Sequence, residues 1–592
     1  MRALASSRLI WTFLVAAFAL IPLVPGLPDF WITLWNYIGL YSLVAIGLVL
    51  LTGVGGMTSF GQAAFVGFGA YTSAVLTSHY GWSAWWTLPV CLLTTGLAAL
   101  LLGLITIRLS GHFLPLGTIA WSIALYYAFG NLEFLGRYDG ITGLPPFNLA
   151  GYDLVGARSI FYLIWLCVFF AVIFSLNVLD SRTGRAIRVL NGTAQAAESF
   201  GVNISRIKLV LFVYAALLAG VSGWLYAHMQ RAVSPSPFGV NAGIEYLLMA
   251  VLGGSGYVLG GVLGSAIVIT LKDHLQSLLP ALIGSDGNFE TIVFGILMVA
   301  VLQVSRQGLW PVVQTILPQP ANKQIDPEAP PLAHQSMPQS GSALLAVEGL
   351  KKQFGGLVAV NDVQFSVKAG EIVGLIGPNG AGKSTTFNLL TGVLAPTAGS
   401  IIYRNEQIAG LTAEEIAKRG IARSFQHVKL VGSMSVLENV AIGAHLRGKA
   451  GFVPSMLKWD RAEEACLIHE AAKQLERVGL SEHIHKPAGS LALGQQRIVE
   501  IARALCLDPA LLMLDEPAAG LRFAEKQQLA ALLDQLRKEG MSIVLVEHDM
   551  DFVMKLTDHI VVLDFGQKIA EGTPTEIAHN PLVLEAYLGG IE

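Results

Sequence analysis

The first hundred residues of the chain carry almost no charge. Between Leu9 and Ile107, Asp29 is the only Asp, Glu, Lys or Arg side chain. Because lipid offers no hydrogen-bond partners, an apolar run of about 20 residues crosses the ~30 Å hydrocarbon layer as a helix. Charged residues make up 13% of the whole chain, and the mean hydropathy is +0.58. The sequence therefore predicts an all-α polytopic membrane domain, followed beyond Leu345 by a normally charged soluble part.

Ten apolar runs in the first half are candidate membrane spans. The third and the eighth are rich in glycine and interrupted, so each is either a span or a re-entrant or broken helix, and about 8–10 spans are expected. The first run follows two arginines, as in a secretory signal, but it lacks a small-residue cleavage site and is expected to remain as a span. The runs cover approximately residues 9–26, 30–52, 57–79, 84–107, 113–132, 159–179, 207–229, 242–256, 258–272 and 289–305.

Basic residues in the loops predict the orientation of these spans. Cytoplasmic loops of membrane proteins carry an excess of Arg and Lys. Counting spans from the most basic loop places Arg2, Arg8 and Arg108 on its side, and both ends of the membrane domain in the cytoplasm. That loop contains Arg182, Arg185, Arg188, Arg206 and Lys208.

Two glycine-rich segments lie within the apolar half. Gly53–Ala74 combines glycines with hydroxyl residues, which suits either close helix packing or an unwound backbone around a substrate cavity. The sequence leaves both interpretations open. Gly256, Gly260 and Gly264 recur every four residues and predict one smooth helical face for packing.

Four segments of this half point to a family. They are S-F-G-Q-A-A-F-V-G-F-G-A-Y at Ser59–Tyr71, R-L-S-G-H-F-L-P-L-G-T-I-A at Arg108–Ala120, I-T-G-L at Ile141–Leu144 and L-G-G-S-G-Y-V-L-G-G at Leu252–Gly261. In order and spacing they resemble the permease of branched-chain amino-acid ABC importers of the bacterial cytoplasmic (inner) membrane. The resemblance implies an extracytoplasmic substrate-binding protein as a partner. Related permeases carry urea and short amides, so the resemblance fixes the fold more firmly than the cargo.

The loop from Asp180 to Lys208 resembles the cytoplasmic coupling helix of this family, which docks onto an ATPase subunit. A solvated basic loop is the alternative interpretation. Three uncharged residues stand where the family usually has charged ones, so the sequence leaves the docking partner open. They are Asn191, Gly192 and Ala194.

A stretch rich in Pro, Gln and Ser separates the two halves of the chain. Its composition favours an extended, semi-rigid tether. Because it leaves the cytoplasmic end of the last predicted span, the part that follows is expected in the cytoplasm. The predicted organisation is a permease domain at 1–315, a linker at 316–343 and an ATP-binding domain at 344–592.

A glycine-rich loop between a strand and a helix carries the clearest chemistry. The apolar run Glu371–Ile376 predicts the strand, and a helical pattern continues through Leu390. Backbone N–H groups of such a loop converge on phosphates, and the helix N-terminus adds positive partial charge. Lys383 is predicted to reach the β- and γ-phosphates of ATP, and the Ser384 hydroxyl to bind Mg²⁺. The predicted nucleotide contacts are Gly377, Pro378, Asn379, Gly380, Ala381, Gly382, Lys383, Ser384 and Thr385.

Two more apolar strands are predicted to bring ionisable residues to the same sheet edge. Ala510–Leu514 is followed by Asp515 and Glu516, which suit a Mg²⁺ ligand and a general base for the attacking water. His548 follows the strand Ser542–Val546 and is predicted to contact the γ-phosphate. A histidine after a strand has no special role in most chains. Here the motifs that follow the other two strands favour a functional role for His548.

These three features together resemble an α/β P-loop ATPase of the ABC type, and residues 344–592 resemble its branched-chain amino-acid subgroup throughout. The resemblance implies that Phe354 stacks on adenine. It also implies that Gln426 senses Mg²⁺ and the attacking water. Gly494 and Gln495, in L-A-L-G-Q-Q-R, take the signature position that approaches the ATP of a second ATPase.

Two positions depart from this ABC pattern. Ala492 replaces the signature serine, and the loss of one hydrogen-bond donor to a developing charge costs on the order of 3 kcal/mol. The backbone of the signature still allows close approach, so a weakened site is expected. Arg522 stands where Asn or Asp is common.

The sequence thus predicts ATP-driven import of branched-chain (hydrophobic) amino acids. Because the resemblance implies that one chain cannot complete an ATP site, the expected partners are a second permease and a second ATPase, either other proteins or a second copy. No nucleic-acid partner is expected. The alternatives are import of urea, short amides or another small polar solute, and an ABC exporter. Exporters extend charged helices well into the cytoplasm, whereas Asp180–Lys208 is the only sizeable cytoplasmic loop predicted.

Overall fold

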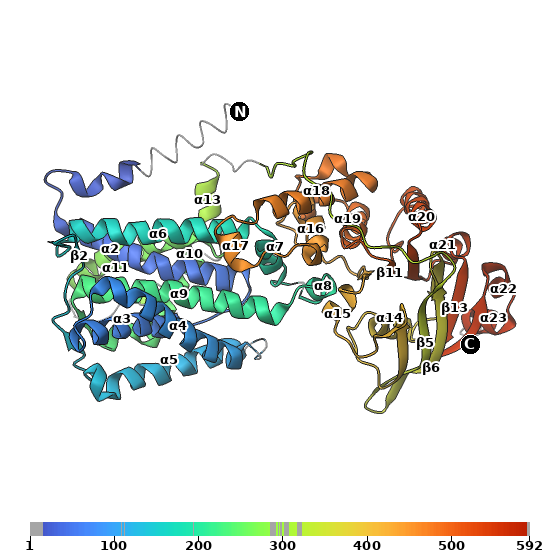
Figure 1. Cartoon of the computed structure of the whole chain (residues 1–592), viewed down its shortest axis with the longest axis horizontal. Coiled ribbons are helices and arrows are strands. Elements are labelled where there is room, and N and C mark those ends of the chain that lie inside the picture. Colours follow the sequence, from blue (N-terminus) through green and yellow to red (C-terminus); the bar gives the residue numbers. More distant parts are fainter. Residues whose placement is uncertain are drawn as a thin grey trace. The chain divides into compact units, whose positions relative to one another are not determined.

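A computed structural model describes residues 16–283 except 108, 110, 112 and 193, then residues 292–293, 295–296, 299–300, 303, 307–316 and 322–588. The chain divides into two compact units (Figure 1). The first consists of Met1–Asp180 with Ser205–Ala321, and the second of Ser181–Ile204 with Asn322–Glu592. The loop that resembles a coupling helix therefore belongs to the second unit.

The first unit is built from long apolar helices. Six of the described helices are long and apolar enough to cross a membrane, which confirms the helical prediction for six of the apolar runs. The helix α2 spans Asp29–Leu48 and continues as a π-helical turn over Val49–Val54. The other five are α4 (Ala84–Thr106), α5 (Phe113–Asn131), α6 (Ala157–Leu179), α9 (Ile204–Gln230) and α11 (Val258–Ile283).

The two runs predicted to be interrupted form shorter helices. The helix α3 (Gln62–Ser78) begins after a non-helical stretch at 55–61, and α10 (Val240–Gly254) has 15 residues. Residues 9–15 of the first predicted run and most of the tenth lie outside the described residues. Small elements add to the predicted helices: β1 (Ile141–Thr142) pairs with β4 (Ala232–Val233), β2 (Asn148–Leu149) pairs with β3 (Tyr152–Asp153), and α13 covers Trp310–Gln314.

Glycines bring α3 and α9 into backbone contact. A Cβ atom at Gly223 of α9 would lie 1.9 Å from the carbonyl oxygen of Val66 in α3. A Cβ atom at Gly69 would lie 2.1 Å from the carbonyl oxygen of Gly220. Any side chain at these positions would push the two helices apart. Close packing is therefore the interpretation that fits the helical part of Gly53–Ala74.

The predicted packing face of three glycines is confirmed for two of them. A Cβ atom at Gly264 of α11 would lie 1.9 Å from Met249 O of α10, and one at Gly260 also meets the α10 backbone. For Gly256 the prediction was wrong. It is exposed with open space around it, because α11 begins only at Val258.

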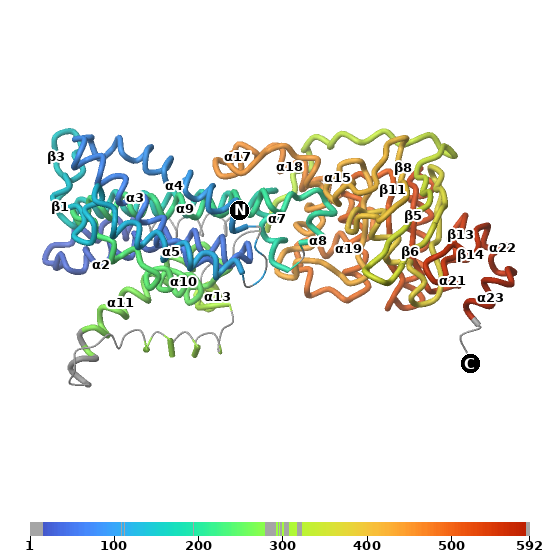
Figure 2. Tube along the Cα trace, turned by 90° about the horizontal axis from the view of Figure 1, so that it is seen from below, coloured from blue at the N-terminus to red at the C-terminus, as the bar shows by residue number. Residues whose placement is uncertain are grey.

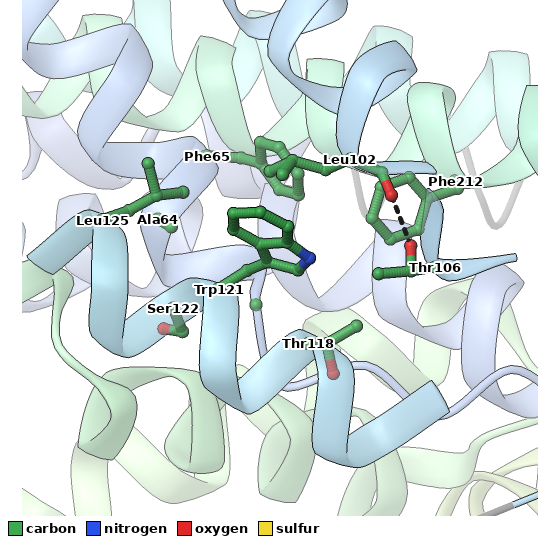
Figure 3. Close-up of a pocket in the computed structure, with 10 residues that line it drawn as sticks. Ala64, Phe65, Leu102, Thr106, Thr118, Trp121, Ser122, Leu125 and Phe212 are labelled. Carbon is green, nitrogen blue, oxygen red and sulfur yellow. Dashed lines mark hydrogen bonds between the residues drawn. The ribbon is translucent and has the colours of Figure 1, made fainter. Parts of the chain in front are cut away.

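A small apolar cavity lies among α3, α4, α5 and α9. Figure 3 shows the ring of Trp121, from α5, beside Phe65 of α3 and Leu102 of α4. Thr106, also in its lining, donates its hydroxyl proton to Leu102 O at 2.6 Å. The cavity volume is about 10 Å³, which is the space of one water molecule. It is therefore far too small to be a binding site for an amino acid.

The second unit contains two sheets, and strands of both are drawn as arrows in Figure 1. One has six strands in the order β10-β11-β12-β7-β13-β14, parallel except for the last pair. The other is antiparallel, in the order β6-β5-β8-β9. One apolar core includes residues from both sheets. The strands are β5 (Ala343–Phe354), β6 (Leu357–Lys368), β7 (Ile372–Ile376), β8 (Ala398–Tyr403), β9 (Glu406–Gln407), β10 (Ile421–Arg423), β11 (Leu511–Asp515), β12 (Ser542–Val546), β13 (His559–Asp564) and β14 (Gln567–Gly572).

Three helices of this unit, α16, α18 and α19, build a second apolar core. We call them the helical part of the unit. In Figure 1 they lie away from β5, β6 and β13, and in Figure 2 α18 and α19 lie away from β13 and β14. The helices of the unit are α7 (Arg182–Val189), α8 (Ala194–Ser199), α14 (Lys383–Leu390), α15 (Ala413–Ala417), α16 (Val436–Ala441), α17 (Phe452–Met456), α18 (Arg461–Arg477), α19 (Leu493–Leu505), α20 (Phe523–Lys538), α21 (Met550–Leu556), α22 (Pro574–Ala578) and α23 (Pro581–Leu588).

Candidate nucleotide-binding site

The glycine-rich loop joins β7 to α14 at one edge of the six-stranded sheet. It follows β7 directly, and α14 begins at Lys383. Gly377, Gly380 and Gly382 have φ angles of +151°, +85° and +92°, and a Cβ atom at Gly377 would lie 2.0 Å from Leu563 O. Glycine alone adopts such angles without strain, so the loop conformation depends on these three residues.

Lys383 is fixed at this loop. The residue is 9% exposed, and its ammonium group donates hydrogen bonds of 2.8 Å to Gly377 O and Pro378 O. Burial lowers the pKa of Lys383, while the nearby Glu516 and Asp515 oppose that shift. The cation therefore lies where the loop N–H groups would hold phosphate.

Asp515 lies at the same edge of the sheet. It ends β11, in register with Val546 of β12, which in turn pairs with Leu375 of β7. Burial raises the pKa of Asp515 to about 6, and the guanidinium of Arg423 opposes this shift. Among the described residues, the Oδ1 atom of Asp515 is buried and has no hydrogen-bond partner.

Glu516 follows in a strained backbone conformation. Its φ angle is +47°, which few residues other than glycine adopt. Its N–H group donates to Val546 O at 2.9 Å, and its carbonyl oxygen accepts a hydrogen bond of 2.9 Å from Arg497 Nη1. Its carboxylate lies 3.8 Å from His548 Nδ1. The structure thus brings together the predicted general base and the predicted γ-phosphate contact.

Arg497 is a residue that sequence reasoning misses. It lies in α19, and besides Glu516 it donates through Nη2 to the carbonyl oxygen of Gln426 at 3.2 Å. Gln426 follows β10 and is exposed. One guanidinium group therefore connects two predicted site residues. The only signal in the sequence was the place of Arg497 within L-A-L-G-Q-Q-R.

Glu547, directly before His548, has a role that its position alone does not reveal. Its carboxylate accepts hydrogen bonds from Ala518 N at 2.7 Å and from His548 N at 3.1 Å. Burial raises the pKa of this carboxyl group. The side chain thus joins the turn after Asp515 and Glu516 to the backbone that carries His548.

Phe354 ends β5 and is 44% exposed. The ammonium group of Lys352 lies 5.0 Å from the centre of its ring. An exposed ring beside a cation suits stacking on a purine base, so the adenine contact remains a consistent prediction.

Three family models match the chain in the order of its sequence. Residues 31–302 match the branched-chain amino acid transport system permease component, 360–519 match the ABC transporter, and 567–592 match the branched-chain amino acid ATP-binding cassette transporter. The high-affinity branched-chain amino acid transport ATP-binding protein LivG of Salmonella typhimurium is 48% identical over 249 residues, which are 42% of this chain and 98% of that protein. The chain belongs to the branched-chain amino-acid ABC transporter family.

A further relative and a solved structure each cover 42% of this ABC transporter chain. The BraF protein of Pseudomonas aeruginosa is 46% identical over 249 residues, which cover 42% of this chain and 98% of that protein. The crystal structure of a nucleotide-free ATP-binding cassette from an ABC transporter is 33% identical, covers 42% of this chain and 99% of its own, and has a TM-score of 0.38. As a family member, the chain is a membrane protein that binds ATP and couples ATP hydrolysis to transport, together with further transporter subunits.

The ABC signature lies at the start of α19. Ala492 precedes the helix, and its N–H group donates to Gln495 Oε1 at 3.3 Å. The side-chain amide nitrogen of Gln495 lies 2.9 Å from His483 Nε2. Within residues 322–588, no hydrogen bond or ion pair joins Gly494 or Gln495 to the loop 377–385. The signature residues and the glycine-rich loop are thus held by separate hydrogen bonds in this part of the chain.

Ser181–Ile204, the segment that resembles the family's coupling helix and is called the coupling segment below, is anchored by buried charges. Arg185 has a side chain that is 2% exposed and forms a two-point ion pair with Glu464 of α18. Arg188 pairs with Glu438 of α16 at 3.0 Å. The alternative of a solvated basic loop was therefore wrong, because these arginines bind carboxylates of the helical part.

The residues predicted to bind Mg²⁺ fit a hard cation. Mg²⁺ takes oxygen ligands, usually one or two carboxylates with hydroxyl, water and phosphate oxygens. Asp515 offers a buried, unpaired carboxylate oxygen, and Ser384 offers a hydroxyl group in the first turn of α14. A buried acceptor without a partner is costly, and a bound cation removes that cost.

Proposed function

We propose that this chain imports branched-chain, hydrophobic amino acids across the bacterial cytoplasmic membrane, with its ATPase domain in the cytoplasm. The proposal is carried by one observation: Lys383, Asp515, Glu516 and His548 meet at one sheet edge in a chain whose first half is a family permease. The names of the relatives supply the substrate class. We propose domain boundaries at 1–315, 316–343 and 344–592.

In the proposed ATP site, the glycine loop and Lys383 bind the phosphates, and Phe354 stacks on adenine. Ser384, Asp515 and Gln426 hold Mg²⁺, which when bound neutralises charge that develops on the phosphate oxygens. The pKa of Asp515, about 6, leaves it mostly ionised at pH 7, as a cation ligand must be.

Hydrolysis then requires a base beside the γ-phosphate. Glu516 takes the proton of the attacking water, and His548, 3.8 Å away, donates a hydrogen bond to the γ-phosphate. Proton removal by a positioned base contributes roughly 10²–10⁴-fold to such a rate. The hydrogen bonds from Arg497 and to Val546 hold Glu516 in its strained conformation, so its carboxylate is positioned before ATP arrives.

The proposed working unit contains two ATPase domains and two permeases. Gly494 and Gln495 of one domain approach the ATP held at Lys383 of the other, as the family resemblance implies, and within residues 322–588 neither is hydrogen-bonded to its own loop. A second copy of this chain or a separate permease and ATPase supplies the missing half. An extracytoplasmic binding protein delivers the amino acid, and ATP binds the closed pair more tightly than the open one, which drives the cycle.

The test is uptake into proteoliposomes that contain the purified chain. ATP is supplied on the side of the ATPase domain, and labelled leucine with a branched-chain amino acid binding protein on the other. We expect ATP-dependent accumulation of leucine that valine and isoleucine inhibit, whereas urea and acetamide do not. Competition by urea or acetamide alone would assign the cargo to small polar solutes.

The matched control is the Glu516→Gln variant, which keeps the size of the side chain and removes the base. Uptake should stop in this variant while ATP still binds. Loss of preloaded leucine from the vesicles upon ATP addition would reverse the direction and contradict import.

A further inference from the structure

The coupling segment and the linker both bind the carboxylate of Glu464. Glu464 lies in α18, and its side chain is 13% exposed. Both of its oxygens bind Arg185 of the coupling segment, with Nη2 to Oε2 at 2.9 Å. The same carboxylate accepts a hydrogen bond of 2.5 Å from Lys323 Nζ of the linker. One cation of the linker and one of the coupling segment therefore pair with the same buried carboxylate.

The linker is also packed by apolar contacts. Residues 322–342 form no helix or strand. Even so, Ile325 and Leu332 pack against the apolar core of the helical part, and Ala329 is 6% exposed. A segment with these contacts is part of the folded ATPase unit and not a free tether.

Hydrogen bonds to side chains of the ATPase domain fix the linker backbone at three residues between 326 and 335. Each place uses one backbone group of the linker and one side chain of the ATPase domain, so the whole stretch from 322 to 335 has a defined position. The pairs are Asp326 O with His469 Nδ1 at 3.1 Å, Ala333 O with Arg447 Nη2 at 3.0 Å, and Gln335 N with Asp508 Oδ2 at 2.5 Å.

Glu464 needs its cations to remain charged in this place. Burial by itself would raise the pKa of Glu464, but Arg185 and Lys323 bring it below the usual value. The carboxylate is thus held ionised by one group from the coupling segment and one from the linker. Removing Lys323 takes away the hydrogen bond to Oε1 of Glu464, so the carboxylate is less firmly fixed in the position where it binds Arg185.

We propose that the linker forms part of the surface to which the coupling segment binds. The permease is thereby coupled to the ATPase domain of its own chain. Lys323 fixes the Glu464 carboxylate where it binds Arg185, and the packed residues 325–335 hold the linker beside α18. The occupant of this surface is the segment 181–204 of the same chain. The consequence for transport rests on the proposed function, whereas the docking is a property of the purified chain.

Hydrogen–deuterium exchange of the purified full-length chain tests the docking. The variant Lys323→Met keeps the apolar stem of the side chain and removes its charge. We expect peptides from 181–204 to exchange about fivefold faster than in the wild type, as weakened local contacts allow more frequent opening. Lys323→Arg keeps the charge and should restore slow exchange.

Lys473→Met is the matched control. Lys473 lies in the same helix as Glu464, is exposed, and is not part of any ion pair in the described part of the chain. Exchange in 181–204 should be unchanged in this variant. Wild-type exchange of these peptides in Lys323→Met would overturn the proposal, and so would equal acceleration in Lys473→Met. Neither result depends on whether the chain transports leucine.

If docking and transport both hold, Lys323→Met should also import about half as much leucine per ATP hydrolysed or less. The ATPase rate itself should remain, because Lys323 binds Glu464 of α18, whereas Lys383 lies at the glycine-rich loop after β7. An unchanged transport ratio together with faster exchange would separate the two parts and contradict the coupling to the chain's own ATPase domain.

Discussion

The two units of the chain bury polar groups of different kinds. In the described residues of the permease unit, the buried polar side chains are hydroxyl groups, amides and one histidine, and no Asp, Glu, Lys or Arg is among them. The ATPase unit buries several charges, including Lys383, Asp515 and Glu547. Hydroxyl groups such as Ser42 and Thr106 donate to carbonyls of their own helices, so they need no partner in another helix.

The buried polar groups of the two units therefore suit different tasks: helix packing in the permease unit and chemistry in the ATPase unit. The permease is held by close approach of helices at glycines such as Gly223, which suits lipid, where an unpaired charge is expensive. The ATPase unit instead buries charges at the proposed site, which would stabilise phosphate and accept a proton from water. Substitutions of charge should therefore act on turnover in the second unit, and substitutions of volume should act on folding in the first.

The largest effect is expected for Glu516→Gln. The glutamine cannot accept the proton of the attacking water, so ATP turnover should fall about 10²–10⁴-fold while nucleotide binding is retained. Steady-state phosphate release and binding of a fluorescent ATP analogue measure the two quantities. Glu482→Gln, at an exposed carboxylate in the same unit, should leave both unchanged. Normal turnover in Glu516→Gln would remove the base role.

The next effect is expected for Gly223→Ala in the permease. The new methyl group would lie 1.9 Å from Val66 O, so α3 and α9 must separate, at a cost on the order of 3 kcal/mol. The unfolding temperature of the membrane domain in detergent should fall clearly. Gly256→Ala is the control, because a Cβ atom there has open space, and it should unfold like the wild type. Equal stability of both variants would refute the backbone contact.

The strands β7, β11 and β12 of the candidate site were predictable because each is a short apolar run that is followed by a polar motif. The strand Ser542–Val546 has the predicted bounds, and β7 and β11 begin one residue later than predicted, with β11 extending to Asp515. All residues of these strands are buried in the parallel sheet, which is why no alternation of polar and apolar residues was needed to find them. Adjacent parallel strands then place the motif residues together.

The residues that sequence reasoning misses act through backbone groups. Arg497 binds two carbonyl oxygens, and the linker is fixed largely by its own N–H and C=O groups. Every residue carries such groups, so the sequence has no pattern that marks them. Gly256 shows a related limit, since its predicted role depended on where α11 begins, and helix ends are the least certain part of a pattern.

A third, smaller effect concerns pH. The folded-state pKa of Asp515, about 6, lies above its unfolded value of 3.8, so this group contributes stability below about pH 4 that is lost as pH rises through 6. Mg²⁺ needs the ionised form, and Mg-ATP affinity should fall about tenfold per pH unit below pH 6. Asp515→Asn should bind Mg-ATP weakly at every pH and unfold at a higher temperature at pH 7 without nucleotide. A sloping affinity in Asp515→Asn would assign the titration to another group.

The smallest effect is expected for Arg497, which connects the signature helix α19 to the proposed general base Glu516. Arg497→Met keeps the length of the side chain but loses the hydrogen bonds to Glu516 O and Gln426 O. Glu516 is then less firmly held in its strained conformation, so kcat for ATP hydrolysis should fall about tenfold, as expected for a misplaced catalytic group. KM for ATP should stay the same, because Lys383 and the glycine loop are unaltered.

Arg497→Lys sharpens that last prediction. A lysine can donate to one of the two carbonyl oxygens but does not reach both. Its ammonium group has one nitrogen atom, whereas the planar guanidinium group of arginine donates through separate nitrogen atoms. An intermediate kcat is therefore expected, with folding and KM as in the wild type. If both variants changed KM and left kcat intact, Arg497 would serve nucleotide binding, and charge at this distance from the phosphates would matter more than the position of Glu516.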